Sequence, residues 1–225
     1  MKKRLHFLVL TFIAVATTAM AQSPWWDNTK STEGISLSGE LGLNLSQFTH
    51  VKRWNGVKAG INIGVMAEKS ILNSLSAKAG IFYTMKGTVG NNDGGFGGNL
   101  KTTFSPSYLE IPILASYRYT LNDAIRLQFD FGPYFAFGLH GKDVKKYSGS
   151  NVAHDSNTEI DLFGGDNPQL KRFDFGFRFG PQIVWKNRYS ASIAYEVSAI
   201  NISKMGGNVG NGNFMINIGY KFYTF

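Results

Sequence analysis

The sequence predicts an all-β fold, an eight-stranded antiparallel up-and-down transmembrane β-barrel, from three observations. Bulky apolar residues alternate with small or polar residues in eight segments, which is the period of a β-strand. A secretory signal precedes these segments. The connections between the segments alternate in length, first long and then short.

The clearest segment covers residues 127–139, where every second residue is apolar and the residues between are polar or small. Its thirteen residues exceed the usual length of a strand. It also carries six large apolar groups besides Pro133, more than one face of a soluble sheet needs. This segment predicts a strand that crosses a bilayer.

The segments before residue 127 repeat the alternation. Their apolar sets are Ile35, Leu37, Leu41, Leu43 and Leu45 in residues 34–46; Val57, Ala59, Ile61, Ile63 and Val65 in residues 57–68; Leu75, Ala77, Ala79, Ile81, Tyr83 and Met85 in residues 75–86; and Leu109, Ile111, Ile113, Ala115, Tyr117 and Tyr119 in residues 108–120. Each set predicts one strand with a single apolar face.

Three segments follow residue 139. Their apolar sets are Phe173, Phe175, Phe177, Phe179, Ile183 and Trp185 in residues 172–186; Tyr189, Ala191, Ile193, Tyr195 and Val197 in residues 189–199; and Phe214, Ile216, Ile218, Tyr220 and Phe222 in residues 213–225. Pro112, Pro133 and Pro181 lie within strands, although proline cannot donate to the ladder; we expect bulges or kinks at Pro133 and Pro181, each of which follows Phe-Gly.

The connections predict the orientation of the barrel. Short turns lie near Asn73, at Asn122–Asp123 and at residues 186–188. The longer connections are residues 47–56, 87–106, 141–171 and 202–212. Short periplasmic turns and long extracellular loops are typical of outer-membrane barrels, and an even strand number places both termini in the periplasm.

Glycine decides which face of the strands points outward. Most strand glycines share the parity of the polar residues: Gly42, Gly60, Gly64, Gly80, Gly132, Gly138, Gly176, Gly180 and Gly219. Gly39 and Gly87 break this rule. An eight-stranded interior has room only for small side chains beside a few larger ones. The apolar set therefore faces lipid, which argues against a soluble lipocalin-like carrier with its apolar set inside.

Three segments make up the predicted chain: a signal peptide at 1–21, a periplasmic N-terminal segment at 22–33 and the barrel at 34–225. Lys2, Lys3 and Arg4 precede an apolar run that is too short to span a bilayer, and Ala19-Met20-Ala21 supplies a cleavage site, which disfavours an uncleaved anchor helix.

Cleavage would leave a net charge of +5. The basic residues are not clustered, so this charge does not predict nucleic-acid binding. The absence of cysteine excludes disulfides, thiolate metal sites and a lipoprotein anchor.

Charged residues of both signs share the predicted lumen face. They are Glu40, Glu110, Asp130, Asp174, Glu196, Lys58, Lys78, Arg118, Arg126, Arg178 and Lys221. All except Lys58 make up the predicted structural ion-pair network, because an unpaired buried charge is costly. A selective ion path is the alternative, and it needs a wider barrel.

No motif predicts catalysis, a cofactor or a metal. His140 with Asp143 and a loop serine would be one Ser-His-acid arrangement, but no spacing supports it. Residues 91–94 and 155–161 place oxygen-bearing side chains close together without the spacing of a calcium loop, and solvated loops are the simpler interpretation. We expect no enzymatic activity.

The loops are the predicted contact sites, because binding residues concentrate on loops held by a rigid scaffold. The candidates are Lys52, Arg53, Trp54, Lys142, Lys145 and Lys146. Trp25 and Trp26 either rest at the periplasmic membrane interface or belong to an exposed tail. The basic surface groups suit the phosphates of lipopolysaccharide.

Residues 107–114, Ser-Tyr-Leu-Glu-Ile-Pro-Ile-Leu, resemble a segment of the PorT-type outer-membrane β-barrel family. Residues 131–134, 173–176 and 219–222 fit the same family pattern. The resemblance implies an eight-stranded barrel without enzymatic activity, and some relatives assist protein secretion. The terminal Phe225 resembles the aromatic that barrel-assembly machinery recognises, although its parity differs from that of Tyr220 and Phe222.

Three functions remain open at this point. The first is a non-enzymatic outer-membrane barrel with a side-chain-filled lumen and loops for structural or interaction roles. The second is an accessory to protein secretion. The third is a lipid-modifying enzyme that depends on His140. Expected partners are membrane lipid, lipopolysaccharide, the assembly machinery and envelope or secretion proteins; no nucleic acid is expected.

Overall fold

The computed structural model describes residues 25–50, 56–93, 99–148, 157–165 and 168–225. The predicted signal peptide, residues 1–21, lies outside the described residues. Within the described ranges, no helix is long and apolar enough to cross a membrane.

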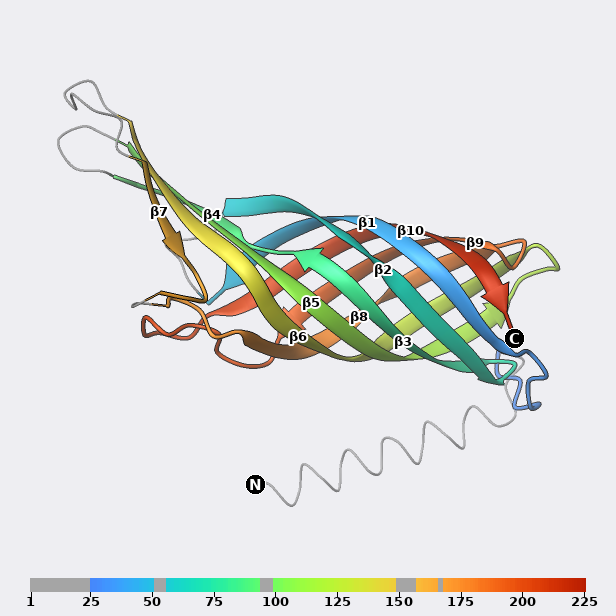
Figure 1. Ribbon diagram of the computed structural model, residues 1–225. Coiled ribbons are helices and arrows are strands. Elements are labelled where there is room, and N and C mark those ends of the chain that lie inside the picture. Colours follow the sequence, from blue (N-terminus) through green and yellow to red (C-terminus); the bar gives the residue numbers. More distant parts are fainter. Residues whose placement is uncertain (1–24, 51–55, 94–98, 149–156, 166–167) are drawn as a thin grey trace, which may run out of the picture.

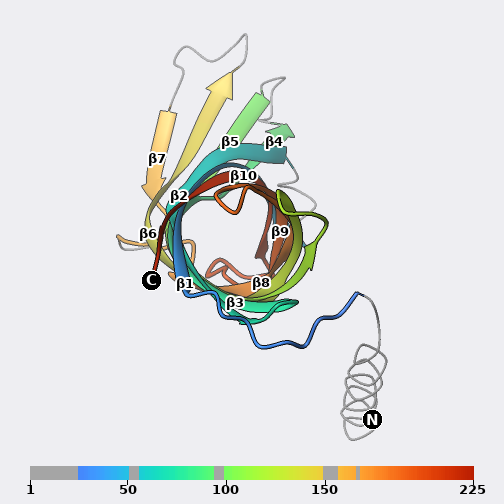
Figure 2. The same ribbon diagram turned by 90° about the vertical axis from the view of Figure 1, so that its right-hand side faces the viewer.

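The described chain forms one antiparallel sheet that closes on itself (Figures 1 and 2). The eight strands of the ring are β1 (Ile35–Thr49), β2 (Gly56–Leu72), β3 (Leu75–Met85), β5 (Asn99–Thr120), β6 (Ile125–Ser148), β8 (Phe173–Trp185), β9 (Tyr189–Ser198) and β10 (Gly210–Thr224). Each strand pairs with the next around the ring, and β10 pairs with β1. Closure leaves the ring without a free edge. The predicted eight-stranded barrel is confirmed.

Two further strands lie beyond the ring, where the sequence predicted only loops. β4 (Thr88–Asp93) pairs with the first part of β5, and β7 (Asn157–Asp161) pairs with the last part of β6. β5 and β6 are therefore 22 and 24 residues long, well past their predicted bounds. Together β4, β5, β6 and β7 form a sheet that flares away from the barrel (Figures 1 and 2), which we call the loop-end extension. Residues outside the bilayer lack the lipid-facing apolar pattern, so the alternation did not reveal these strands.

The alternation of faces follows the prediction. Phe129 and Phe131 of β6 are about half exposed, at 47% and 53%, whereas Gln128, the residue before Phe129 in the same strand, is 4% exposed. A Cβ atom built on any of the nine predicted lumen glycines would meet another atom at less than 3.0 Å. The lumen has no space for larger side chains at these positions, so the apolar set points outward.

Gly87 breaks the glycine parity because its backbone conformation, not the lack of space in the lumen, requires glycine. It lies beyond the end of β3, with a φ of +142° that side-chain-bearing residues rarely adopt. A Cβ there would also lie 2.1 Å from the carbonyl oxygen of Phe104.

The structure has no β-bulge at Pro133 or Pro181, so the prediction of bulges at these prolines is wrong. β6 pairs with β8 in one continuous register through Pro133 and Pro181. Instead, two residue pairs, those of Gly132 and Pro133, are missing from the ladder between β5 and β6, which continues beyond them in the same register. The ladder between β8 and β9 does the same at Gly180 and Pro181. Glycine permits close approach of the neighbouring backbone, so the proline costs a ladder bond without shifting the strand.

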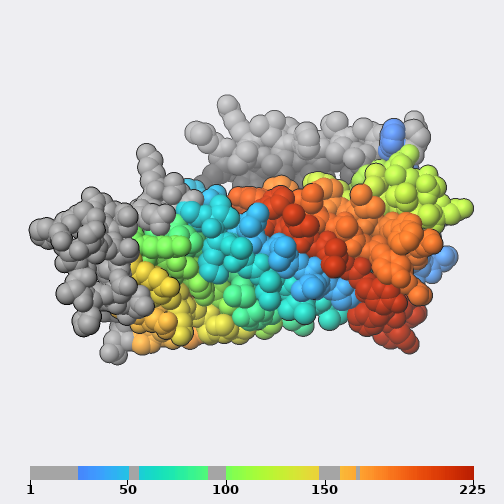
Figure 3. Space-filling view, turned by 90° about the horizontal axis from the view of Figure 1, so that it is seen from above, coloured from blue at the N-terminus to red at the C-terminus, as the bar shows by residue number. Residues whose placement is uncertain are grey.

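A true irregularity lies at the seam between the first and last strands. In Figure 3, β1 and β10 run side by side in blue and red across one face of the molecule. Their register shifts between Leu37 and Ser38, which leaves Phe222 as an extra residue. Beyond the shift, Tyr223 pairs with Leu37, so it shares a face with Phe225. The bulge therefore accounts for the reversed parity of Phe225.

The three predicted short turns lie at one end of the barrel, which we call the short-turn end; the opposite end is the loop end (Figure 1). The segment before β1 follows one side of the rim at the short-turn end (Figure 2). There the rings of Trp25 and Tyr119 lie 5.1 Å apart, and those of Trp26 and Tyr117 are stacked at 6.0 Å. This segment is attached to the barrel rather than being a free tail.

Candidate functional site

The lumen contains two groups of charged side chains. The group nearer the loop end, the loop-side ion cluster, consists of Lys86, Glu110, Arg178 and Glu196. Lys86 Nζ lies 2.7 Å from Glu110 Oε2 on β5 and 3.0 Å from Glu196 Oε2 on β9. β3 and β9 stand on opposite sides of the ring, so the ammonium group just after β3 bridges the lumen.

Neighbouring polar groups surround the loop-side ion cluster. Arg178 Nη1 lies 4.0 Å from Glu196 Oε1, and the Asn213 amide donates to Glu196 at 3.1 Å. The ammonium of Lys86 also lies 4.2 Å from the ring centroid of Tyr134. Asp174 accepts hydrogen bonds from Tyr134, Ser198 and Asn211 rather than an ion pair.

The second group, the turn-side ion cluster, lies nearer the short-turn end. Lys78 Nζ donates to Asp130 at 2.9 Å and to Gln182 of β8 at 2.5 Å. Gln128 donates to Glu68 at 3.1 Å, and Ser76 donates to the same carboxylate at 2.6 Å. Lys78 therefore links β3 to strands across the lumen, as Lys86 does at the other level.

Glu33 joins the turn-side ion cluster from outside the barrel strands. Its carboxylate lies 2.6 Å from Arg118 Nη2 and 2.9 Å from Arg126 Nη2, and Ser70 donates to it at 2.8 Å. Partial burial raises the pKa of Glu33, but the Ser70 hydrogen bond and the charges of Arg126 and Arg118 outweigh burial and lower the pKa to about 2. An ionised Glu33 thus attaches the N-terminal segment to the lumen.

The structure brings most of the predicted network residues into these clusters, with three exceptions. Glu40 is buried but forms no ion pair with any described residue. Asp174 is held by neutral donors, and Lys221 Nζ donates to Asn187 at 2.8 Å. Lys58, left out of the predicted network, donates only weakly to the Ala59 carbonyl at 3.5 Å.

Sequence reasoning missed three members of the clusters. Lys86 and Glu68 share the lumen parity of their strands, so the alternation contained a signal for both. Lys86 is the last residue of the predicted segment 75–86, and no residue after it continues the alternation. Glu33 precedes the first strand, and no sequence signal pointed to its role.

An apolar cluster, the loop-end cap, covers the loop-side ion cluster. Its buried members are Phe48, Phe104, Tyr108, Tyr134, Ala136, Leu162, Phe163, Leu170, Ile202 and Val209. Leu162 and Phe163 come from the connection before β8, and Ile202 and Val209 from the connection before β10. Backbone bonds fix both connections, such as Leu162 N–H to Gly141 O at 3.0 Å and Ile202 N–H to Val209 O at 2.9 Å. These two connections fold into the barrel mouth instead of standing free.

The lumen offers little free space where the structure describes it. A cavity between Glu40, Lys78 and Gln182 has a volume of about 30 Å³. That volume suits a water molecule and is far too small for an organic substrate. Chemically, the lumen can hold fixed charges and link strands across the barrel.

The predicted loop contacts are placed in part. Lys52, Arg53 and Trp54 lie outside the described residues. Lys142 and Lys146 are exposed on the outer face of the loop-end extension, where Lys142 Nζ lies 2.7 Å from Glu159. Lys145 lies on the opposite face, 3.8 Å from the buried Asp143. Lys146 stands directly opposite Lys101 of β5 in the register.

His140 and Asp143 do not form a catalytic pair. The register shift beside Tyr108 leaves His140 exposed on the outer face, where its Nε2 lies 3.2 Å from the hydroxyl of Tyr83. Asp143 is buried on the inner face and accepts a hydrogen bond from Gln169 at 3.3 Å. The two side chains therefore face opposite sides of β6.

Three solved structures illustrate what the chain resembles in shape. Ail of Yersinia pestis, crystallised with a heparin analogue, shares 15% identity over 85% of this chain and 100% of its own, with a TM-score of 0.45. Neisserial surface protein A shares 13% identity over 84% and 100%, with a TM-score of 0.47. The outer membrane enzyme PagL shares 14% identity over 81% and 99%, with a TM-score of 0.43. No curated protein sequence matches the chain.

A family-wide sequence profile gives the assignment that these distant structures do not. The profile described as "outer membrane protein beta-barrel domain" matches residues 20–203, which is most of the chain. The closed ring of eight antiparallel strands with an apolar outer face agrees with that description. The chain belongs to the outer membrane protein beta-barrel domain family, whose members reside in the bacterial outer membrane.

Proposed function

We propose that this protein is a non-enzymatic integral outer-membrane barrel that presents its loop-end extension to a partner in the cell envelope. The observation that carries the proposal is the filled lumen. Lys78 and Lys86 connect opposite walls, and the loop-end cap covers the mouth. A filled lumen supports neither transport nor catalysis inside the barrel, so the projecting extension is the part left for contact.

The proposed orientation follows from the connections. The short-turn end, with both the segment before β1 and the end of β10, faces the periplasm, and the loop-end extension faces the cell exterior. Residues 1–21 act as a cleaved signal peptide, and residues 22–33 form the periplasmic segment. The basic outer face with Lys101 and Lys146 meets the phosphates of lipopolysaccharide, and the last strand engages the barrel-assembly machinery.

A secretion accessory is the second candidate. It is supported by the resemblance of residues 107–114 to the PorT-type barrels, some of which assist protein secretion. Co-purification with components of a secretion system would distinguish it from a purely structural barrel. A lipid-modifying enzyme has weaker support, because His140 and Asp143 face opposite sides of β6.

Photo-crosslinking in intact cells tests the proposal. A crosslinking residue replaces Lys146 on the loop-end extension; matched controls carry it at Phe131 on the lipid-facing wall and at Asn122 in a short turn. We expect a defined envelope partner or lipopolysaccharide to be captured from position 146 and lipid alone from position 131. A protein partner captured from position 122 and not from position 146 would contradict the proposed contact surface.

A further inference from the structure

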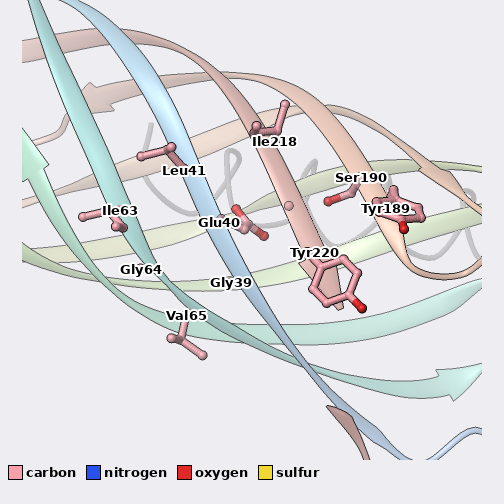
Figure 4. Close-up of a pocket in the computed structure, with 11 residues that line it drawn as sticks. Gly39, Glu40, Leu41, Ile63, Gly64, Val65, Tyr189, Ser190, Ile218 and Tyr220 are labelled. Carbon is pink, nitrogen blue, oxygen red and sulfur yellow. The ribbon is translucent and has the colours of Figure 1, made fainter. Parts of the chain in front are cut away.

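The outer wall of the barrel has a notch at Gly39. This residue lies on the lipid-facing parity of β1, opposite Val65 of β2 and Tyr220 of β10. A Cβ atom built there would meet no other atom within 4 Å, whereas the lumen glycines have no such room. The wall therefore lacks one outward side chain at this point, and a groove of about 750 Å³ lies around it (Figure 4).

The groove has apolar walls along most of its length. Ile63 and Val65 of β2 line one side, and Ile218 of β10 lines the other. Leu41 lies between them on β1, opposite both Ile63 and Ile218. Tyr189 and Tyr220 lie toward the short-turn end of the groove (Figure 4). An apolar groove on a lipid-facing wall that ends at tyrosine hydroxyls matches a molecule with an apolar chain and a polar head.

A basic pocket lies at the short-turn end beside these tyrosines. Its volume is about 340 Å³, and Lys186, Arg188 and Lys221 line it without any acidic side chain. The lumen bases Lys78 and Lys86 have carboxylate partners. Among the described residues, by contrast, no carboxylate pairs with any of the three bases of the pocket. Lys186 and Arg188 thus have no ion-pair partner among the described residues, whereas Glu68 and Glu33 act electrostatically on Lys221.

The pocket approaches the groove through Arg188. Tyr189 follows Arg188 in the chain, whereas Lys221, next to Tyr220, has the lumen parity of β10 and also lines the lumen cavity. The two tyrosines are cross-strand partners whose ring centroids lie 5.5 Å apart. The guanidinium of Arg188 lies 6.0 Å from the ring centroid of Tyr220. An apolar chain in the groove would therefore bring its headgroup to Arg188 and to Lys186 in the same pocket.

We propose that the notch at Gly39 and the basic pocket together bind one anionic phospholipid. An acyl chain occupies the groove, the phosphate lies against Arg188 and Lys186, and Tyr189 and Tyr220 border the junction of chain and headgroup. Basic side chains near a membrane surface attract anionic lipids, and guanidinium groups bind phosphate oxygens in pairs. The site rests on membrane residence, not on the proposed role of the loop-end extension, and it lies in the leaflet at the short-turn end.

Native mass spectrometry of the full mature chain in non-ionic detergent tests this site. The protein is offered phosphatidylglycerol and phosphatidylcholine with the same acyl chains, in equal amounts. We expect one retained phosphatidylglycerol. Gly39→Leu should abolish its retention by filling the groove, and Arg188→Gln should weaken retention about fivefold, the effect of one basic group near an anionic lipid.

Ala79→Leu is the matched control, since Ala79 is exposed on the same outward parity of β3, away from the groove. It should leave lipid retention unchanged, and heat-modifiable migration on a gel verifies that each variant is folded. Equal retention of the two lipids, or undiminished retention by folded Gly39→Leu, would overturn the proposal. So would a dimer without bound lipid that Gly39→Leu dissociates, because the occupant would then be a second barrel.

Discussion

At the scale of single residues, Lys86 has the largest consequence for stability. Its side chain is fully buried between Glu110 and Glu196, with its ammonium group against the ring of Tyr134. The two carboxylates come from strands on different sides of the ring. Removing the lysine would leave both carboxylates without their closest positive charge. A buried charge that loses its partner lowers the free energy of unfolding.

Lys86→Met should therefore lower the free energy of unfolding by about 3 kcal/mol, the lower end for a buried pair that loses one partner. Urea unfolding of the barrel in detergent, followed by tryptophan fluorescence, measures the change. The double variant Lys86→Met and Glu110→Gln is the control and should recover most of the loss, because it removes one carboxylate together with the lysine and leaves Glu196 paired with Arg178. If Lys86→Met were as stable as the unmodified chain, the charge of Lys86 would not stabilise the loop-side ion cluster, and the account would be contradicted.

At the scale of elements, one carboxylate adds to the hydrogen bonds and ring contacts that hold the segment before β1. Glu33 bridges Arg118 and Arg126, and the hydroxyl of Tyr117 donates to the carbonyl of Trp25 in the same segment. The side chain of Glu33 is still 38% exposed, so solvent screening limits the ion pairs to less than about 1 kcal/mol. These contacts hold the segment on the rim.

The attachment of this segment should depend on pH. The pKa of Glu33 falls from an ordinary 4.5 to about 2 in the folded protein, so its stabilisation is complete above pH 4.5 and is lost as the pH falls toward 2. The difference in unfolding free energy between the unmodified chain and Glu33→Gln should therefore be present at pH 6 and vanish near pH 2. A difference that stays constant across this range would contradict the role of the ionised carboxylate.

The strands were predictable to different degrees. The alternation located β3, β8 and β9 within one or two residues, because one face of each meets lipid along its whole length. β5 and β6 were predicted too short, because their outer parts pair with β4 and β7 in water, where polar side chains such as Lys101 and Thr103 hide the pattern. The loop-end cap was missed for a related reason: Leu162 and Phe163 occur in an otherwise polar connection without any period.

At the scale of the whole molecule, one physical constraint explains what could be predicted of the candidate sites. A lipid-facing outer wall and a narrow lumen impose opposite chemistry on alternate residues, so the lumen position of Lys78, Asp130 and Glu110 followed from parity. Partners across the ring did not follow, because the alternation carries no information on which level of one strand meets which level of the opposite strand. Nor did the sequence reveal the notch, since Gly39 stood out only as an exception to the glycine rule.

The central claim is that the odd-numbered residues of 127–139 face lipid around a filled lumen. The chain has no cysteine, so single cysteines with spin labels can be placed at 128, 129, 130, 131, 135 and 136 without a background signal. Accessibility to oxygen in lipid bilayers, measured by electron paramagnetic resonance, should be high at 129, 131 and 135 and low at 128, 130 and 136. Accessibility without this period of two, or with the even positions higher, would contradict the account.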